Sequence, residues 1–221
     1  MPITDAMRTR HVVRQYLDTP LDDDVAAALL ARVEEANAFH GTDIRLLTGS
    51  ARVFGPLWGT VRARSVHNCL VMAGPDTPDL DERLGHAGAG LMLAAQELGL
   101  NTWWVGGTFS KRAAVRASGA TGRVVAVVAL GYGATRGTAH DSKRPEEVAS
   151  YEGEPPAWFT QGVEAALLAP TAFGKQAFTL AGRDGEVVIT CEEGDYAGQD
   201  RGIVKYFFEV GAGRDNFRWA S

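Results

Sequence analysis

Three segments of this sequence hold residues suited to binding a flat small molecule that carries a phosphate. The first runs over residues 8–16, where Arg10 and Arg14 stand four positions apart. On a helix, residues at this spacing project from one face, and two guanidinium groups on one face can clamp a phosphate. The same spacing is also typical of an ordinary solvated helix face, so this segment alone decides little.

The other two segments combine glycine with short polar side chains. Gly106 and Gly107 follow a short apolar run, and glycine lets backbone N–H groups approach a flat ligand because no Cβ stands in the way. Residues 169–178 form a loop of small and polar residues that can hydrogen-bond the edge of a planar heterocycle. Taken singly, each segment is explained equally well as an ordinary turn or loop.

The usual side-chain signatures of catalysis are missing from the sequence. No GxSxG, HExxH, CxxC or phosphate-loop pattern occurs, and the five histidines never fall at metal-ligand spacing. The two cysteines, Cys69 and Cys191, are far apart and have no evident partner base. No metal site is therefore expected, and an enzyme of this sequence would take its chemistry from a cofactor.

Together, the segments resemble those of the FMN-dependent nitroreductase family. Residues 10–16 look like its RRSxRxY phosphate segment, and residues 99–107 look like its GLGTCWxGG segment. Residues 142–148 look like its KxRxPxEEV stretch, and residues 169–178 look like its APSAxNxQPW loop. With the last helix, the resemblance covers nearly the whole chain.

The resemblance implies a role for each matched position. Arg10, Arg14 and Arg144, with Lys143, would hold the FMN phosphate, and the glycines after the short strand would lie near the reactive edge of the flavin. Residues of the late loop would line its pyrimidine or ribityl side. The complete set of cofactor-binding residues implied is Arg10, His11, Val12, Arg14, Val105, Gly106, Gly107, Lys143, Arg144, Pro170, Thr171 and Gly174.

Several positions depart from the family pattern. Val12 replaces a serine, so only its backbone N–H can serve the phosphate, and His11 replaces the second arginine. Gly174 replaces an asparagine, and Ala177-Phe178 replaces Pro-Trp. Because each lost hydrogen bond costs ~0.5–1.5 kcal/mol, these changes predict FMN binding weakened by roughly a hundredfold.

The order of the motifs is unusual for the family. Its flavin loop ordinarily follows the first long helices, but residues 35–45 lack the motif, and the loop appears in the C-terminal half. This resembles a fused, single-chain branch in which one polypeptide imitates a dimer and holds one complete flavin site. Similar Ala-Leu helix ends before residues 44–47 and 178–180 hint at an internal duplication, although shared composition explains them equally well.

The resemblance implies an FMN-dependent oxidoreductase. NADH or NADPH would donate electrons, and a nitroaromatic compound, a quinone or a similar electrophilic acceptor would receive them. No side-chain acid or base is expected, so the flavin itself would be the catalytic group. Two alternatives stay open: a flavin- or nucleotide-binding protein of the same fold without turnover, and a specialised flavin enzyme such as a dehalogenase.

Hydrophobic periodicity and turn residues predict the elements that position these segments. Helices are expected over residues 4–16, 21–37, 80–98, 111–118, 158–168 and 201–212. Strands are expected over residues 44–48, 64–73, 102–105, 123–132, 178–181 and 186–191. Residues 133–156, rich in Gly, Pro and charge, are expected to cross the surface as a long connection.

The expected fold is an α/β (α+β) three-layer sandwich, with a mixed, mainly antiparallel sheet flanked by helices. One nitroreductase-like domain would cover residues 1–221, as an N-terminal half 1–135, a connection 136–156 and a C-terminal half 157–221. The helix over 80–98 is expected to be buried beside the helix over 201–212, by pseudo-twofold symmetry. One central sheet would hold the strands over residues 64–73, 123–132, 178–181 and 186–191.

Composition excludes some classes of partner. The formal charge of −5 leaves no basic excess for nucleic acid. Neither a signal peptide nor an apolar run of ~20 residues is visible, so we expect a cytoplasmic protein without a membrane partner. A small-molecule electron acceptor is the expected partner. The fused interpretation allows a monomer and does not forbid a dimer.

Overall fold

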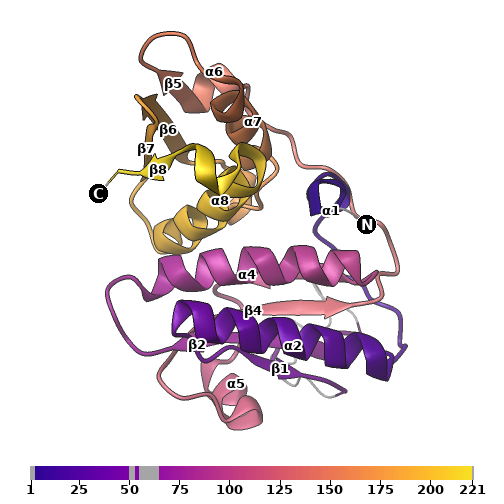
Figure 1. Ribbon diagram of the computed structural model, residues 1–221. Helices are drawn as coiled ribbons and strands as arrows, with labels where there is room; N and C mark the ends of the chain where they lie inside the picture. Colours follow the sequence, from indigo (N-terminus) through magenta and orange to yellow (C-terminus); the bar gives the residue numbers. More distant parts are fainter. Residues whose placement is uncertain (1–2, 50–52, 55–64, 221) are drawn as a thin grey trace.

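The computed structural model describes residues 3–49, 53–54 and 65–220. Arg64, where a strand is expected to begin, therefore lies outside the described residues. None of the helices in these ranges is long and apolar enough to cross a membrane. The first and second halves of the chain form two bodies of secondary structure, one above the other in Figure 1.

The N-terminal half is built on a four-stranded antiparallel sheet of order β1-β2-β4-β3. Its strands are β1 (Arg45–Leu47), β2 (Asn68–Gly74), β3 (Asn101–Val105) and β4 (Arg123–Gly131). Every residue of β2 is buried, because helices cover both faces of the sheet. Leu70 and Met72 pack toward α2 (Asp23–His40) and α4 (Leu80–Glu97), whereas Cys69 and Val71 face the side of α5 (Lys111–Ser118).

The C-terminal half holds a second four-stranded sheet, of order β5-β6-β7-β8. Its strands are β5 (Ala149–Tyr151), β6 (Phe178–Arg183), β7 (Glu186–Cys191) and β8 (Arg218–Trp219). Burial alternates strictly along β6, since α7 (Ala157–Ala166) and α8 (Ala197–Ala212) cover one face only. Asp184 and Gly185 both have positive φ in the tight β6–β7 turn, as the Asp-Gly pair predicts.

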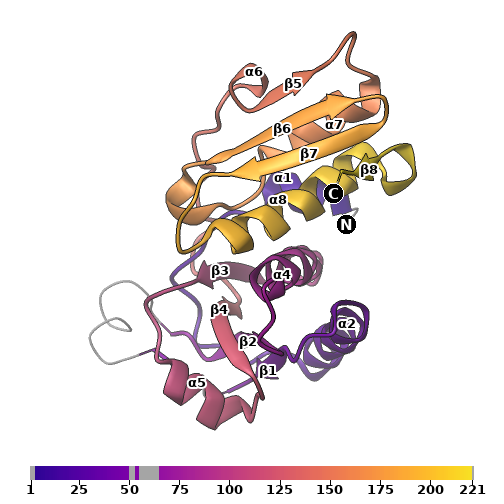
Figure 2. The ribbon, with the colours of Figure 1, turned by 90° about the vertical axis from the view of Figure 1, so that its left-hand side faces the viewer.

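Helices α4 and α8 join the two halves at the middle of the molecule (Figures 1 and 2). A Cβ on Gly85 would collide with the backbone of Gln199, and a Cβ on Gly202 would collide with the backbone of Glu82. Gln199 lies three positions before Gly202, and Glu82 lies three positions before Gly85, so the two contacts have the same spacing. This contact is reciprocal, like that across a twofold axis, and the predicted central helix pair is confirmed.

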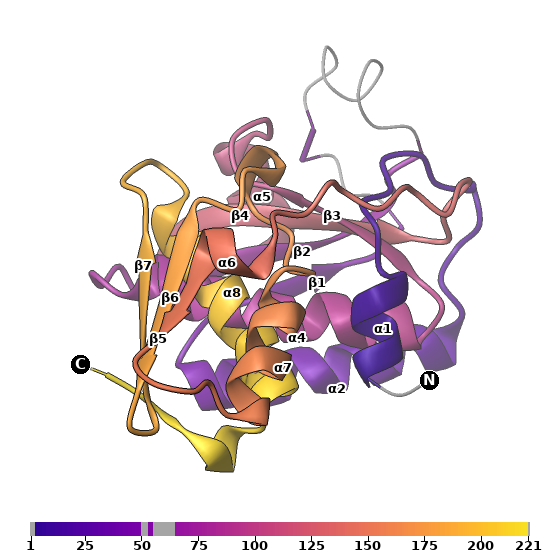
Figure 3. The ribbon, with the colours of Figure 1, turned by 90° about the horizontal axis from the view of Figure 1, so that it is seen from above.

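Short α1 (Ile3–Thr9) lies beside this central pair. Figure 3 shows it next to α4, and its Ala6 and Met7 are buried with Ala89 and Leu93 of α4. The chain then leaves the helix and runs along the edge of the first sheet. Val12 forms a parallel bridge with Thr102, and Tyr16 forms an antiparallel bridge with Gly133.

The mixed α+β fold is confirmed, but three expectations about elements are wrong. The strands do not form one central sheet, because the helix layers of α4 and α8 separate two sheets. The helix expected over residues 4–16 ends at Thr9, since bridges to the first sheet hold residues 12–16 extended. The surface connection also contains α6 (Pro145–Val148) and β5, which pairs in parallel with β6.

Candidate functional site

Arg10 is a buried cation without an anionic partner among the described residues. Arg10 is only 4% exposed, and its Nε atom is buried without a hydrogen bond to any described residue. Burial lowers the pKa of the guanidinium to about 10. Burying a charge without compensation is expensive, whereas a bound anion would offset that penalty. Arg10 is therefore the strongest candidate for binding a phosphate.

The backbone around Arg10 follows from the end of α1. The N–H of Arg10 donates to Ala6 O at 2.9 Å, and the N–H of Val13 then donates to Thr102 O at 3.3 Å. The two arginines therefore do not share a helix face, contrary to the sequence expectation. Arg14 is exposed, and its guanidinium lies 5.4 Å from the centre of the Trp103 ring.

The long connection, residues 133–156, passes close to His11. Burial lowers the pKa of His11, and the charges of Arg10 and His140 act in the same direction. A Cβ on Gly137 would also touch the Cβ of His11 and the carbonyl of Val12. The start of the chain and the connection therefore lie against each other.

The connection is in turn tied to the late loop through Gln176. This residue is 1% exposed; its Nε2 donates to Leu167 O at 2.8 Å, and its Oε1 accepts from the N–H of Lys143 at 2.7 Å. The Nζ of Lys143 donates to the carbonyl of Gln176 at 2.9 Å. Nε2 of His140 lies 3.0 Å from Leu167 O. Residues 140–143 thus fix the base of the loop.

Arg144 has acidic partners of its own. Its guanidinium pairs with Glu146 at 3.4 Å and with Glu147 at 3.1 Å, and its side chain is 73% exposed. The hydrogen bond and charge of Glu147 and the charge of Glu146 raise the pKa of Arg144. Convergence of Arg10, Arg14 and Arg144 on one anion stays a prediction.

The loop after α7 has an uncommon backbone. Phe173, Gly174 and Gln176 all have positive φ, at 57°, 68° and 48°. Non-glycine residues seldom adopt this region, and such strain concentrates at ligand-binding and active sites. Thr171 stabilises the turn, because its Oγ1 accepts from the N–H of Gln176 at 2.9 Å. Pro170, immediately before it, is half-buried.

Tyr196 connects this loop with the paired glycines of the other half. Any Cβ on Gly106 or Gly107 would collide with the Tyr196 side chain. The ring of Phe173 meets the ring of Tyr196 edge-on, with centroids 5.9 Å apart. Gly106 and Gly107 follow Val105 at the buried end of β3. Two segments about 65 residues apart in the chain thus share one aromatic neighbour, as their resemblance to a common site requires.

Asp200 holds the same loop from α8. Its carboxylate accepts the N–H of Ala172 at 3.0 and 3.1 Å. Burial raises the pKa of Asp200 to about 6, although the bond from Ala172 acts in the opposite direction. Sequence reasoning missed Tyr196 and Asp200, because it began the last helix at residue 201. An acidic residue in the first turn of α8 was the available signal.

Comparisons with known proteins identify the family and the fold of the chain. Residues 2–212 match the family model described as "Putative TM nitroreductase". A "putative nitroreductase" structure from Thermotoga maritima has a TM-score of 0.70 at 18% identity, covering 97% of this chain and 85% of that one. No curated protein matches the sequence.

Two further structures share the fold over a smaller part of the chain. A "putative nitroreductase in complex with fmn" from Desulfovibrio desulfuricans has a TM-score of 0.51 at 17% identity, covering 70% of this chain and 99% of that one. A "Putative NADH dehydrogenase/NAD(P)H nitroreductase" from Bacteroides thetaiotaomicron has a TM-score of 0.52 at 14% identity, covering 66% and 95%. With the family match over nearly its whole length, the chain belongs to the nitroreductase family described by that model.

Proposed function

We propose that this protein is an FMN-dependent oxidoreductase that takes electrons from NADH or NADPH in the cytoplasm. Its acceptors would be nitroaromatic compounds, quinones or similar electrophiles. The buried guanidinium of Arg10, which has no anionic partner among the described residues, is the observation that carries the proposal, because it fits the phosphate of FMN. Similar structures include one in complex with FMN and one named an NAD(P)H nitroreductase.

The other residues implied by the family resemblance would bind the remainder of such a cofactor. Arg10 would hold the phosphate, with the backbone of His11 and Val12 beside it. The loop at Pro170, Thr171 and Gly174 would line the flavin edge, opposite the glycines after Val105. Lys143 anchors the loop through Gln176 and so contributes to the shape of the site.

Chemistry in this proposal divides between cofactor and protein. When bound, FMN supplies the hydride transfer, and the protein supplies binding, orientation and electrostatics. Asp200 fixes the loop backbone at Ala172, and Tyr196 contacts both Phe173 and the paired glycines. No side chain is assigned as acid or base.

One chain would complete this site without a partner subunit. Gly106 belongs to the first half, Phe173 belongs to the second, and Tyr196 contacts both. The reciprocal contact of α4 and α8 supports the fused arrangement, because it places two equivalent helices within one polypeptide.

Replacement of Arg10 tests the proposal. The Arg10→Ala variant is expected to bind FMN at least tenfold more weakly, since it removes a charge-assisted bond worth more than ~1.4 kcal/mol. Quenching of flavin fluorescence on titration of apo-protein measures both affinities. Arg14→Ala, which removes an exposed arginine, is the matched control and should change affinity less.

The outcome that contradicts the proposal is equal FMN affinity for wild type and Arg10→Ala, or no FMN binding by either. A protein that binds flavin without turnover is the second candidate, favoured by Val12 and Gly174, which remove side-chain bonds to the cofactor. Oxidation of NADPH in the presence of a quinone separates the two functions. A flavin-loaded protein that oxidises neither NADH nor NADPH would be the binding protein.

A further inference from the structure

A cavity of about 500 Å³ opens between the ends of α2, α4 and α8 and the C-terminal residues 214–219. Pockets for small molecules usually have volumes of ~300–1,000 Å³, so this cavity is large enough to hold a ligand. None of the residues assigned to the cofactor lines it. It is therefore a separate feature, and the proposed function leaves it without a role.

One wall of the cavity presents an aromatic ring to solvent. Phe39, in the last turn of α2, is 74% exposed. Trp219 and Phe217 also line the cavity, but side chains of the protein already contact their rings. Lys205 Nζ lies 5.2 Å from the centre of the Trp219 ring, and Phe217 stacks on Trp158 with ring centroids 5.7 Å apart. Phe39 is thus the ring that a flat ligand can cover, which would remove apolar surface from water.

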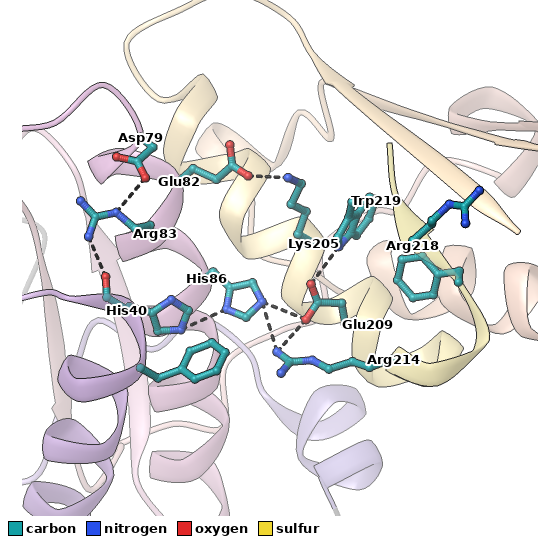
Figure 4. A pocket seen from close by; sticks show the side chains of 12 residues that line it. His40, Asp79, Glu82, Arg83, His86, Lys205, Glu209, Arg214, Arg218 and Trp219 are labelled. Atoms are coloured by element: carbon teal, nitrogen blue, oxygen red, sulfur yellow. Dashed lines mark hydrogen bonds and ion pairs between the residues drawn. The ribbon is translucent and has the colours of Figure 1, made fainter. Parts of the chain in front are cut away.

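A guanidinium group stands beside this exposed ring. The Arg214 guanidinium lies 6.0 Å from the centre of the Phe39 ring. Figure 4 shows Arg214 next to Glu209 and His86, and its Nη2 is 2.6 Å from Glu209 Oε2. The Arg214 side chain is 54% exposed, whereas that of Glu209 is 11% exposed. A ligand in the cavity would therefore meet the cation, with the carboxylate behind it.

The hydrogen-bonding capacity left over at this end consists of donors. Glu209 Oε1 accepts from Trp219 Nε1 at 2.9 Å, and Glu209 Oε2 contacts both Arg214 and His86. Arg214 uses Nη2 for its contacts with Glu209 and His86, and its Nε and Nη1 bond no group in the described part of the chain. A guanidinium donates and never accepts. The protonation of His86 does not alter this surplus, because an imidazole is either neutral or positive.

The remaining acidic groups of the cavity lie elsewhere. Among the described lining residues, the other carboxylates are those of Asp79 and Glu82, at the start of α4. Asp79 pairs with Arg83 at 3.0 Å, and Glu82 pairs with Lys205. Figure 4 shows both pairs away from Arg214. They therefore place no unpaired negative charge beside it.

These observations define the chemistry of a matching ligand. It needs a flat apolar part to cover Phe39 and a hydrogen-bond acceptor for Arg214. A carboxylate suits Arg214 best, because hydrogen bonds between ionised partners are shorter and stronger than those between neutral ones. A cationic ligand would be repelled by Arg214 and would find Glu209 already occupied by its own donors.

We propose that this cavity is a second ligand site, for a small aromatic carboxylate. The ring of the ligand packs against Phe39, and its carboxylate accepts hydrogen bonds from Arg214. Binding is non-covalent and leaves the pair of Arg214 and Glu209 in place. The site does not depend on the proposed cofactor function, since Arg10 and the late loop take no part in it.

Calorimetric titration of the purified protein with 2-naphthoate tests the site, at neutral pH where the compound is ionised. Wild type is expected to bind it. The neutral amide 2-naphthamide has the same ring without the charge, and it should bind at least tenfold more weakly, a difference of ~1.4 kcal/mol. Equal affinity for the two compounds, or no binding of 2-naphthoate, would overturn the proposal.

Replacement of the guanidinium provides the first variant. Arg214→Gln should weaken binding of 2-naphthoate about tenfold and that of 2-naphthamide much less, because it removes a charge that the amide does not use. Arg183→Gln is the matched control, since it replaces an exposed, acid-paired arginine of β6 that does not line the cavity. This control should bind 2-naphthoate as wild type does.

A second variant keeps the proposal falsifiable if loss of the partner of Glu209 disturbs folding. Phe39→Ala changes an exposed side chain, so it should fold normally and still bind 2-naphthoate about threefold to tenfold more weakly. Leu30→Ala, at an exposed position of the same helix outside the cavity, should bind as wild type. Unchanged affinity in Phe39→Ala would contradict the site, as would loss of binding in Arg10→Ala, which would place the compound at the cofactor site.

Discussion

At the scale of single residues, the candidate site contains charged groups that are removed from water and residues in a seldom-adopted backbone conformation. Arg10 is a buried cation, Asp200 is a largely buried carboxylate, and Phe173 and Gly174 have positive φ. Such features cost stability unless a ligand or neighbouring group compensates them. Substitutions at these positions therefore separate ligand binding from folding.

Gly174 tests the flavin loop. Its φ of 68° suits asparagine better than other side chains, and the family pattern has asparagine at this position. Gly174→Asn is expected to strengthen FMN binding by ~0.5–1.5 kcal/mol through one additional hydrogen bond. Fluorescence titration measures the gain. Gly174→Ala, which adds strain without an amide, should give none, and a similar gain there would disprove the explanation.

Asp200 makes stability depend on pH. Because its pKa is raised to about 6, the folded protein keeps a proton that the unfolded chain releases near pH 4. The free energy of unfolding therefore falls as pH rises between about 4 and 6. Asp200→Asn keeps an oxygen for the N–H of Ala172 and should be more stable above pH 6, by about 1–3 kcal/mol.

Urea unfolding at pH 5 and pH 8 measures this effect. The exposed Asp215→Asn variant is the control and should change neither value appreciably. If Asp200→Asn were less stable than wild type at pH 8, the ionised carboxylate would be favourable in the fold, and the argument from burial would be wrong.

At the scale of elements, local sequence patterns correctly predicted the helices and strands that depend mainly on local interactions. The bounds of α5 and β7 agree to the residue, and those of α4 differ by one. Residues 10–16 could not be predicted, because bridges to Thr102 and Gly133 override a helical pattern. The strands β5 and β8 have three and two residues, too few for a periodic signal.

The site shows the same division. Motif resemblance indicated Arg10, the paired glycines and the late loop as candidates, since those segments are local in sequence. Tyr196 and Asp200 act on loops distant in the chain, and apart from the acidic residue in the first turn of α8 nothing in their immediate neighbours indicates it. The division into two sheets was equally hidden, because pairing partners for β6 and β7 come from the connection and the C-terminus.

The contact of α4 and α8 gives a prediction at this scale. Gly85→Ala places a methyl group against the backbone of Gln199, which cannot move without separating the helices. Destabilisation of about 1–3 kcal/mol is expected, despite the better helix propensity of alanine. Gly202→Ala should behave similarly. Gly194→Ala, where an added Cβ meets nothing within 4 Å, is the control for chemical denaturation.

At the scale of the whole molecule, the two halves contribute jointly to one candidate cofactor site. We expect a single chain in solution to bind one FMN, with no partner subunit required. Sedimentation of the flavin-loaded protein, read at the flavin absorbance, measures mass and stoichiometry together. Flavin found only in dimers, or two flavins per chain, would contradict the single-chain arrangement.

The reciprocal glycine contact also affects how this protein can evolve. In a dimer of identical chains, every mutation appears twice, so both ends of the twofold axis must change together. Here each end has its own codons, and Arg83 and Asp200 carry opposite charges, each two positions before the glycine of its helix. Selection can therefore preserve one end while the other drifts or gains a separate use, provided the two glycines persist.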